Sequence, residues 1–252
     1  MLLALADPFR SGLTVPAWID LSAIVVGALS GGLLAAREGF AVTGVLLLSL
    51  VSGLGGGLIR DVLLGVGTPV ALTDPLYLPA VSATALVAFF FAGWLARLNP
   101  LLVVLDALAL GLFTVVGAEK ADLYGFPGAS VVFLGVVTAV GGGLIRDVIL
   151  GQVPDIARPG TVNAFAALLG AILLVTTKRV AGVDTVLADL VTIVFVTGLR
   201  LLGVWRGWQI SGPVDLSSRL PNLAPLARTR SRTLRLARSG PLRRSRGSDR
   251  RP

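Results

Sequence analysis

Seven apolar segments, separated by short polar or proline-containing stretches, follow one another along the first 204 residues. A segment of about 20 apolar residues is long enough to cross a bilayer as a helix. The pattern therefore predicts an all-α membrane protein with seven transmembrane helices. The expected spans are residues 19–36, 43–65, 80–96, 101–118, 129–151, 162–177 and 185–204.

Tryptophans support this division of the chain, because each of the four lies at the end of an expected span. Tryptophan side chains gather at the two membrane–water interfaces, where one end of the ring is apolar and the other is wet. The alternative, that they fill gaps in a core, does not explain why all four lie at span ends. They are Trp18, Trp94, Trp205 and Trp208.

Composition agrees with a membrane protein and limits the chemistry. Only 14% of the residues are charged, 54% are hydrophobic and the mean hydropathy is +0.86. There is no cysteine and no histidine, which excludes thiol chemistry, histidine catalysis and the usual transition-metal ligands. No nucleophile–base pair stands out either. We therefore expect a protein that is not an enzyme and carries no cofactor.

The net charge of +8 belongs to the C-terminal tail. Residues 211–252 hold 11 arginines and 2 aspartates, whereas residues 1–210 hold 11 basic and 12 acidic residues. The tail is expected to be disordered and to stay cytoplasmic, which places the N-terminus outside for seven spans. A solvated tail that fixes the orientation is the first interpretation of its arginines, anionic lipid is the candidate partner, and no nucleic acid is expected. The basic cluster comprises Arg228, Arg230, Arg232, Arg235 and Arg238.

An internal repeat organises residues 1–210, the expected transmembrane domain. Residues 20–65 align without a gap on residues 106–151, an offset of 86, with 19 identities in 46 positions. Because each copy holds three spans, the second copy is expected to be inverted in the membrane. The predicted architecture is a 3+3 inverted repeat, with repeat one at about 19–98 and repeat two at about 101–178, followed by a seventh helix at about 185–204.

The strongest repeated feature is a glycine triplet in spans two and five, followed by an identical Leu-Ile-Arg-Asp. Small residues allow close helix packing, whereas a hinge would open backbone carbonyls to a wet cavity. A phosphate-binding loop requires a strand–loop–helix context that is absent. Because the triplets are duplicated beside charged residues, we favour hinges beside a polar cavity. They are Gly55, Gly56, Gly57, Gly141, Gly142 and Gly143.

Charged residues beside the triplets are the main candidates for a polar network or pore lining. Neighbouring residues on a helix do not face each other, so each Arg and Asp is expected to need a separate partner. A purely structural clamp between the repeats is the alternative. Asp20 is interpreted as a helix-start residue, and Glu119-Lys120 as an interfacial pair, with a group at the mouth of a path as the alternative. The candidates are Arg60, Asp61, Arg146, Asp147, Asp106, Ser52 and Thr138.

The segment 138–154, which includes the second triplet and ends in Gln-Val-Pro, resembles the repeated signature of the prokaryotic trimeric intracellular cation channel family. Sequences of this family are also labelled glycine transporters. Residues 20–65 resemble the same pattern, and the resemblance covers about residues 19–205 without the tail. It implies a homotrimer with a potassium-permeable pore in each protomer, lined by spans two and five, which are kinked at the triplets.

Three functions remain open at this point. A monovalent cation channel is the leading interpretation. A secondary transporter of a small zwitterion such as glycine would use the Arg-Asp pairs to hold a carboxylate and an amine. A structural membrane protein would use the triplets for packing alone.

Overall fold

The computed structural model describes residues 17–65, 67–95, 99–157 and 162–208, with the side chains of all of these except residues 17, 92–95 and 99. The chain divides into two units, residues 1–210 and 211–252, and every described residue belongs to the first. The predictions for the arginine-rich tail lie outside the described residues.

The described chain contains helices and connecting turns, without strands. Seven of the helices have 17 or more residues: α1 (Ala17–Arg37), α2 (Val42–Leu64), α4 (Tyr77–Leu95), α5 (Asn99–Leu123), α6 (Gly128–Ile149), α7 (Asn163–Arg179) and α8 (Thr185–Trp205). A short helix α3 (Val70–Thr73) and the 3₁₀ helix η2 (Asp155–Ala157) lie in two of the connections. Each expected span coincides with one of the long helices.

Five of these helices, α1, α2, α5, α6 and α8, are long and apolar enough to cross a membrane. In α4 the described side chains cover only the apolar stretch Tyr77–Phe91, and α7 has 17 residues. The all-helical membrane class is therefore confirmed, whereas seven crossings stay a prediction.

The 86-residue repeat is visible in the element boundaries. Glycines with positive φ follow α1 and α5 at Gly39 (77°) and Gly125 (74°), and follow α2 and α6 at Gly65 (65°) and Gly151 (66°). Only glycine enters this left-handed region without cost, so the same turn recurs at the same repeat position. The repeat therefore pairs α1 with α5, α2 with α6, and α4 with α7.

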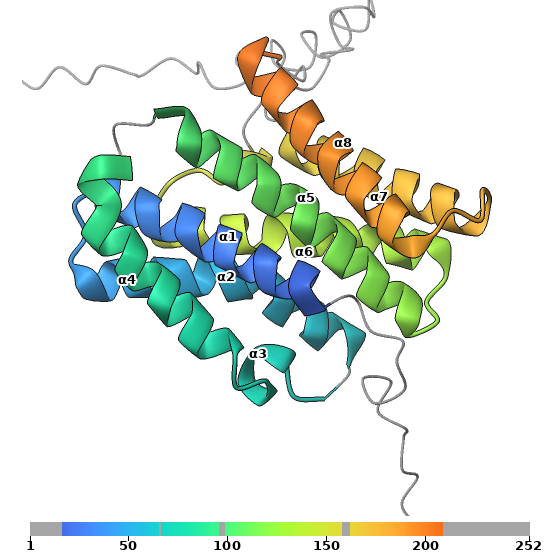
Figure 1. Ribbon diagram of the computed structural model, residues 1–252, viewed down its shortest axis with the longest axis horizontal. Helices are drawn as coiled ribbons and strands as arrows, with labels where there is room; N and C mark the ends of the chain where they lie inside the picture. Colours follow the sequence, from blue (N-terminus) through green and yellow to red (C-terminus); the bar gives the residue numbers. More distant parts are fainter. Residues whose placement is uncertain (1–16, 66, 96–98, 158–161, 209–252) are drawn as a thin grey trace, which may run out of the picture. The chain divides into compact units, whose positions relative to one another are not determined.

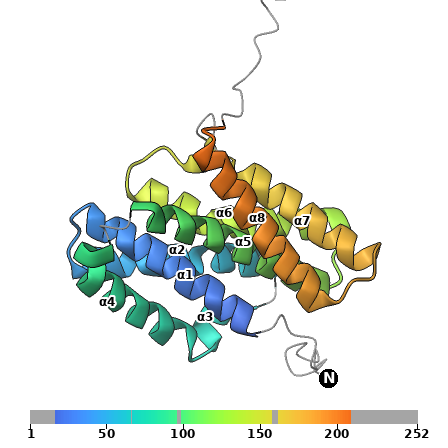
Figure 2. The same ribbon diagram turned by 45° about the horizontal axis from the view of Figure 1, so that its top comes forward.

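Four helices, α1, α2, α5 and α6, form the centre of the described part. There α1 packs on α2 and α5, α5 packs on α6, and α2 packs on α6. Figure 1 shows α1 and α5 running in opposite directions, as an inverted repeat requires. Helix α4 flanks the α1–α2 side, while α7 and α8 flank the α5–α6 side, in both views (Figures 1 and 2). Inversion relative to a membrane stays a prediction.

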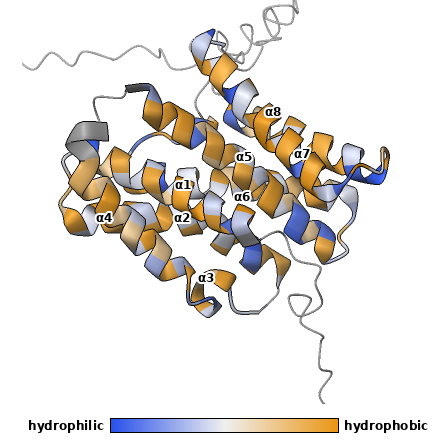
Figure 3. Cartoon of the chain, viewed as in Figure 1, coloured by the Kyte–Doolittle hydropathy of each residue, from blue (hydrophilic) through white to orange (hydrophobic). Residues whose placement is uncertain are grey.

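The outer surface is apolar and the interior holds charged side chains, which reverses the usual order of a water-soluble protein. Phe90 is 74% exposed and Val194 is 71% exposed, whereas Arg60 and Asp61 are 2% and 1% exposed. Hydrophobic residues predominate along the helices in Figure 3, with hydrophilic residues between them. Trp18 lies in the first turn of α1 and Trp205 ends α8, and both are exposed.

Candidate functional site

The two glycine triplets form the crossing of α2 and α6. A Cβ at Gly56 would lie 2.2 Å from the Thr138 carbonyl oxygen, and a Cβ at Gly142 would lie 2.7 Å from the Ser52 carbonyl oxygen. Both helices continue without interruption through their triplets. The crossing itself therefore has the close backbone contact of the packing interpretation, and bending at the triplets stays a prediction.

The third glycine of each triplet differs from the first two. A Cβ at Gly57 or at Gly143 would have as its nearest neighbour the guanidinium of the following arginine, Arg60 or Arg146, at 3.7 Å in both cases. These two positions have room for a side chain, and each faces one of the two charged clusters.

The expectation that adjacent Arg and Asp would not pair is wrong. Arg60 Nε donates to Asp61 Oδ1 at 2.8 Å, and Arg146 Nε donates to Asp147 Oδ1 at 3.1 Å. Neighbouring Cβ atoms do point about 100° apart on a helix, but the long arginine side chain bends its Nε back to the adjacent carboxylate.

Each of these aspartates also has a partner outside its own helix, as expected. The second oxygen of Asp61 accepts the backbone N–H of Val70, the first residue of α3, at 3.0 Å. The second oxygen of Asp147 accepts the N–H of Asp155, the first residue of η2, also at 3.0 Å. The carboxylates therefore hold the connection after α2 and the connection after α6 in the same way.

The arginines extend from these pairs to the repeat-related aspartates of α1 and α5. Arg146 Nη1 donates to Asp106 Oδ1 at 3.1 Å, and Arg60 Nη1 lies 3.9 Å from Asp20 Oδ1. Asp20 lies in the first turn of α1 as expected, but it also accepts the Tyr77 hydroxyl at 2.5 Å. It is therefore part of the cluster as well as a helix-start residue.

Two further cations break the symmetry between the repeats. Lys120 Nζ donates to Asp61 Oδ1 at 2.7 Å, across from α5 to α2. Arg200 of α8 lies 3.7 Å from Asp155 and 3.9 Å from Asp106. The cluster of Asp20, Arg60 and Asp61, here the repeat-one cluster, thus receives its extra cation from the second repeat. The cluster of Asp106, Arg146 and Asp147, here the repeat-two cluster, receives its extra cation from α8.

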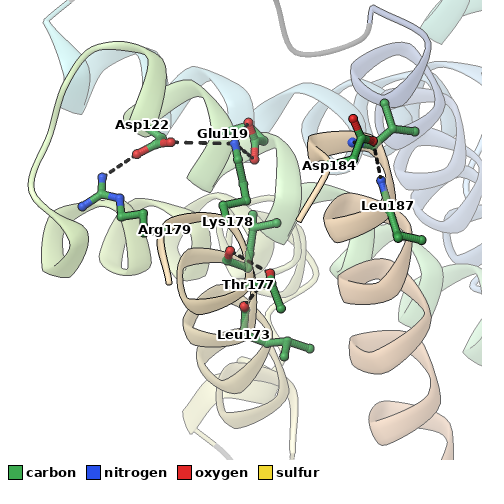
Figure 4. A network of polar contacts seen from close by, with 10 residues as sticks. Glu119, Asp122, Leu173, Thr177, Lys178, Arg179, Asp184 and Leu187 are labelled. Carbon is green, nitrogen blue, oxygen red and sulfur yellow. Dashed lines mark hydrogen bonds and ion pairs between the residues drawn. The ribbon is translucent and has the colours of Figure 1, made fainter. Parts of the chain in front are cut away.

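The reading of Glu119-Lys120 as an interfacial pair is wrong. Glu119 is 4% exposed and Lys120 is 3% exposed, and they point to different partners. Glu119 accepts Lys178 Nζ at 2.6 and 2.7 Å. Figure 4 shows this contact within a network that continues through Asp122 to Arg179. The pair looked interfacial because it follows an apolar run, but α5 continues past it, Lys178 of α7 contacts Glu119 and Asp61 of α2 contacts Lys120.

Two cavities lie beside the glycine crossing. The larger, about 50 Å³, lies beside the repeat-two cluster and is lined by residues of α1, α2, α5, α6, η2 and α7. The smaller, about 10 Å³, lies beside the repeat-one cluster. Asp20, Gly57, Arg60, Asp61 and Tyr77 line the smaller one, and their repeat-related positions line the larger: Asp106, Gly143, Arg146, Asp147 and Asn163.

Three of the residues that line the larger cavity carry a neutral side-chain oxygen without a hydrogen-bond partner. Ser30 Oγ, Ser52 Oγ and Asn163 Oδ1 are buried and have no hydrogen-bond partner in the described part of the chain. Buried polar atoms are normally paired, so three unpaired oxygens at one cavity indicate a site for water or a ligand. Thr138, also a candidate, instead donates to the Leu134 carbonyl at 2.6 Å. Within the described residues no group of His, Cys, Asp and Glu side chains has the arrangement of a metal site.

Sequence reasoning found the two arginine–aspartate pairs, Asp106 and Ser52, but missed several residues that complete the site. Extending the 86-residue comparison past Gly65 aligns Tyr77 with Asn163, and that was the available signal for this pair. Lys120 and Arg200 have no charged counterpart at the repeat-related position, or lie outside the repeat, so the repeat gave no signal for them.

Comparison with known families gives a consistent match. The family model described as Glycine transporter matches the chain twice, over residues 17–93 and 103–179, again an offset of 86. A UPF0126 inner membrane protein of Escherichia coli K12 is 33% identical over 78% of this chain and 94% of its own length. A UPF0126 membrane protein of Deinococcus radiodurans is 42% identical over 61% of this chain and 72% of its own length.

Solved structures with the same fold are channel proteins by name. The TRIC trimeric intracellular cation channel orthologue from Rhodobacter sphaeroides superposes with a TM-score of 0.71 at 34% identity, covering 75% of this chain and 97% of its own. A structure described as the basis for conductance through TRIC cation channels has a TM-score of 0.70 at 30% identity, covering 79% and 98%.

Proposed function

The chain belongs to the prokaryotic trimeric intracellular cation channel family, whose sequence model is described as glycine transporter, and on this basis we propose that it is a passive monovalent-cation channel. The path runs within one protomer, through the two cavities beside the α2–α6 crossing. The permeating ion is potassium, and three copies assemble with one path each. The role is therefore transport rather than catalysis.

The observation that carries the proposal is the oxygen lining of the larger cavity. Ser30, Ser52 and Asn163 offer unpaired oxygens, and Asp106 adds a carboxylate that is 27% exposed at the side chain. Oxygen ligands replace the hydration shell of an alkali cation. A cavity lined in this way favours a cation over an anion.

The pairing of the two arginines also favours a cation as the permeating ion. A free guanidinium in the path would repel cations, but Arg60 and Arg146 each contact two carboxylates. Pairing also offsets the high cost of a lone charge inside a membrane. Both arginines therefore hold the helices together while leaving the cavity oxygens to the ion.

Planar-bilayer recording of the purified protein tests the proposal. Discrete current steps that reverse near the potassium equilibrium potential in a potassium–chloride gradient support a cation channel. Absence of steps in correctly inserted protein, together with no ion flux in liposomes, contradicts it and favours a structural role. Crosslinking of the purified protein in detergent tests the trimer separately.

Transport of a small zwitterion is the second candidate, because the family model is described as glycine transporter. In that case one arginine would have to release its carboxylates to bind the substrate carboxyl group. Saturable glycine uptake into liposomes without current steps would favour this function. The pairing of both arginines makes the channel the better-supported proposal.

The remaining features of the proposal concern the membrane. We place seven spans across the bilayer, with the N-terminus outside and the arginine-rich tail against anionic lipid on the cytoplasmic side. The glycine triplets act as hinges that change the width of the path. Bending there would move the third glycines, Gly57 and Gly143, which face the charged clusters.

A further inference from the structure

One aromatic residue, Phe113 of α5, lines both cavities. It is among the lining residues of the larger cavity and of the smaller one, and it is 5% exposed. The other residues of the smaller cavity belong to the repeat-one cluster or lie next to it, whereas the larger cavity contains the repeat-two cluster. The Phe113 side chain therefore stands where the two polar compartments meet.

Phe113 also departs from the symmetry of the repeat. Its repeat-related position is Gly27 of α1, which lines the larger cavity. A Cβ at Gly27 would lie 2.9 Å from Phe113 Cε2 and 3.3 Å from Cζ. The ring thus occupies the space left by the missing side chain of its own repeat partner, at the contact of α1 with α5.

From this placement we propose that Phe113 is the gate of the ion path, an apolar barrier between the two cavities. The inference rests on the proposed function. An apolar constriction stops ions because water leaves it, so an ion would have to shed its hydration shell without replacement oxygens. Oxygens line the cavity on one side of the ring and the Asp20–Asp61 cluster lines the other, so the ring is the apolar step between two polar compartments.

The alternative role for Phe113 is that of a core residue alone, since it also packs in the main hydrophobic cluster. The two roles predict different effects of removing the ring. A core residue leaves a dry hole and a less stable protein. A gate residue leaves a continuous wet path between two cavities that polar groups already line.

Cysteine labelling separates the two roles, because the chain has no native cysteine. Gly57→Cys places a thiol in the smaller cavity and Gly143→Cys places one in the larger, at repeat-related positions with room for a side chain. A membrane-impermeant cationic methanethiosulfonate reagent is then applied to either face of proteoliposomes. Each cysteine variant is made in three backgrounds: native, Phe113→Ala and Phe113→Val. The matched control is Phe133→Ala, which removes an exposed ring on α6.

With Phe113 in place, each thiol should react much faster from one face than from the other, and the two thiols should react faster from opposite faces. In Phe113→Ala each thiol should react from the far face at least about tenfold faster, the factor that a barrier lowered by about 1.4 kcal/mol gives. Phe113→Val should give an intermediate rate and tests the gate even if the alanine variant does not insert. Phe133→Ala should leave sidedness unchanged.

Unchanged sidedness in an inserted Phe113 variant would overturn the gate, as would equally fast labelling of both thiols from the two faces in the native background. Potassium flux measured on the same vesicles separates this inference from the proposed function. Lost sidedness without any gain in flux would keep Phe113 as the barrier between the compartments but contradict the cation channel. Lost sidedness with raised flux supports both.

Discussion

The ammonium of Lys120 lies 2.7 Å from Asp61 Oδ1 and joins α5 of the second repeat to α2 of the first. Asp61 also accepts Arg60 Nε and the N–H of Val70, so one carboxylate connects three segments of the chain. At the repeat-related position of Lys120 stands Leu34. This bridge between the halves therefore has no repeat-related counterpart.

Lys120→Met is expected to destabilise the protein strongly. Removal of one partner of a buried ion pair leaves an uncompensated charge and costs about 3–5 kcal/mol. The measurement is thermal unfolding in detergent, followed by tryptophan fluorescence. Lys120→Met combined with Asp61→Asn should recover part of the loss, because the amide carries no charge. A single variant as stable as the native protein would contradict the bridge.

The glycine crossing gives a prediction with an internal control. Gly56→Ala should lower the free energy of unfolding by about 1–3 kcal/mol, the usual cost of overpacking, because its Cβ would lie 2.2 Å from the Thr138 carbonyl oxygen. Gly57→Ala, one residue further on, has no neighbour closer than 3.7 Å and should be tolerated. Thermal unfolding of the two variants, and of Gly142→Ala against Gly143→Ala, checks this. Equal effects at both positions would mean that the close contact is absent in the membrane.

Sequence alone located most of the fold because the signals were local or duplicated. Apolar runs placed the long helices to within a few residues, and the repeat gave the pairing of α1 with α5 and of α2 with α6. Arg60, Asp61 and their repeat partners were found because charge in an apolar run is costly. The pairing within Arg60-Asp61 was missed because it depends on side-chain reach, which helix periodicity does not describe.

The role of Lys120 was missed for another reason. Hydropathy places a residue along its own helix but gives no information on the neighbour that covers it, so a charge near the end of an apolar run reads as exposed. Phe113 has the same difficulty, since a phenylalanine in an apolar run carries no polar signal. The sequence signal for Phe113 lies in the repeat alignment, where Phe113 is aligned with Gly27. The sequence does not predict whether α2 and α6 bend at the triplets, because close packing and hinging need the same small residues.

The basic tail is predicted to act on membrane binding rather than on ion flux. Residues 211–252 carry 11 arginines against 2 aspartates, and each arginine near an anionic surface contributes about 1 kcal/mol to binding. Deletion of residues 220–252 should leave potassium flux in liposomes unchanged. It should also reduce the binding of detergent-solubilised protein to anionic vesicles, with neutral vesicles as control. Loss of flux in an inserted, correctly assembled truncation would instead make the tail part of the gate.

The last prediction concerns two buried serines of α2 that differ in what they line. Ser52 Oγ and Ser49 Oγ both lack a hydrogen-bond partner within the described chain, but only Ser52 is among the residues lining the larger cavity. Ser52→Ala and Ser49→Ala should therefore leave the melting temperature nearly unchanged, since neither breaks a hydrogen bond within the protein. Ser52→Ala should lower single-channel potassium conductance by severalfold, because it removes an oxygen from the ion path, and Ser49→Ala should not.

Both variants are measured in planar bilayers under symmetric potassium chloride, and in detergent for thermal stability. Ser52→Thr keeps the hydroxyl and should retain more of the conductance than Ser52→Ala, which separates loss of the oxygen from loss of volume. Equal conductance for Ser52→Ala and the native protein would remove Ser52 from the path. A fall for Ser49→Ala alone would instead place the path further along the contact of α2 with α1, near Gly32, where an added Cβ would lie 2.4 Å from Ser49 Oγ.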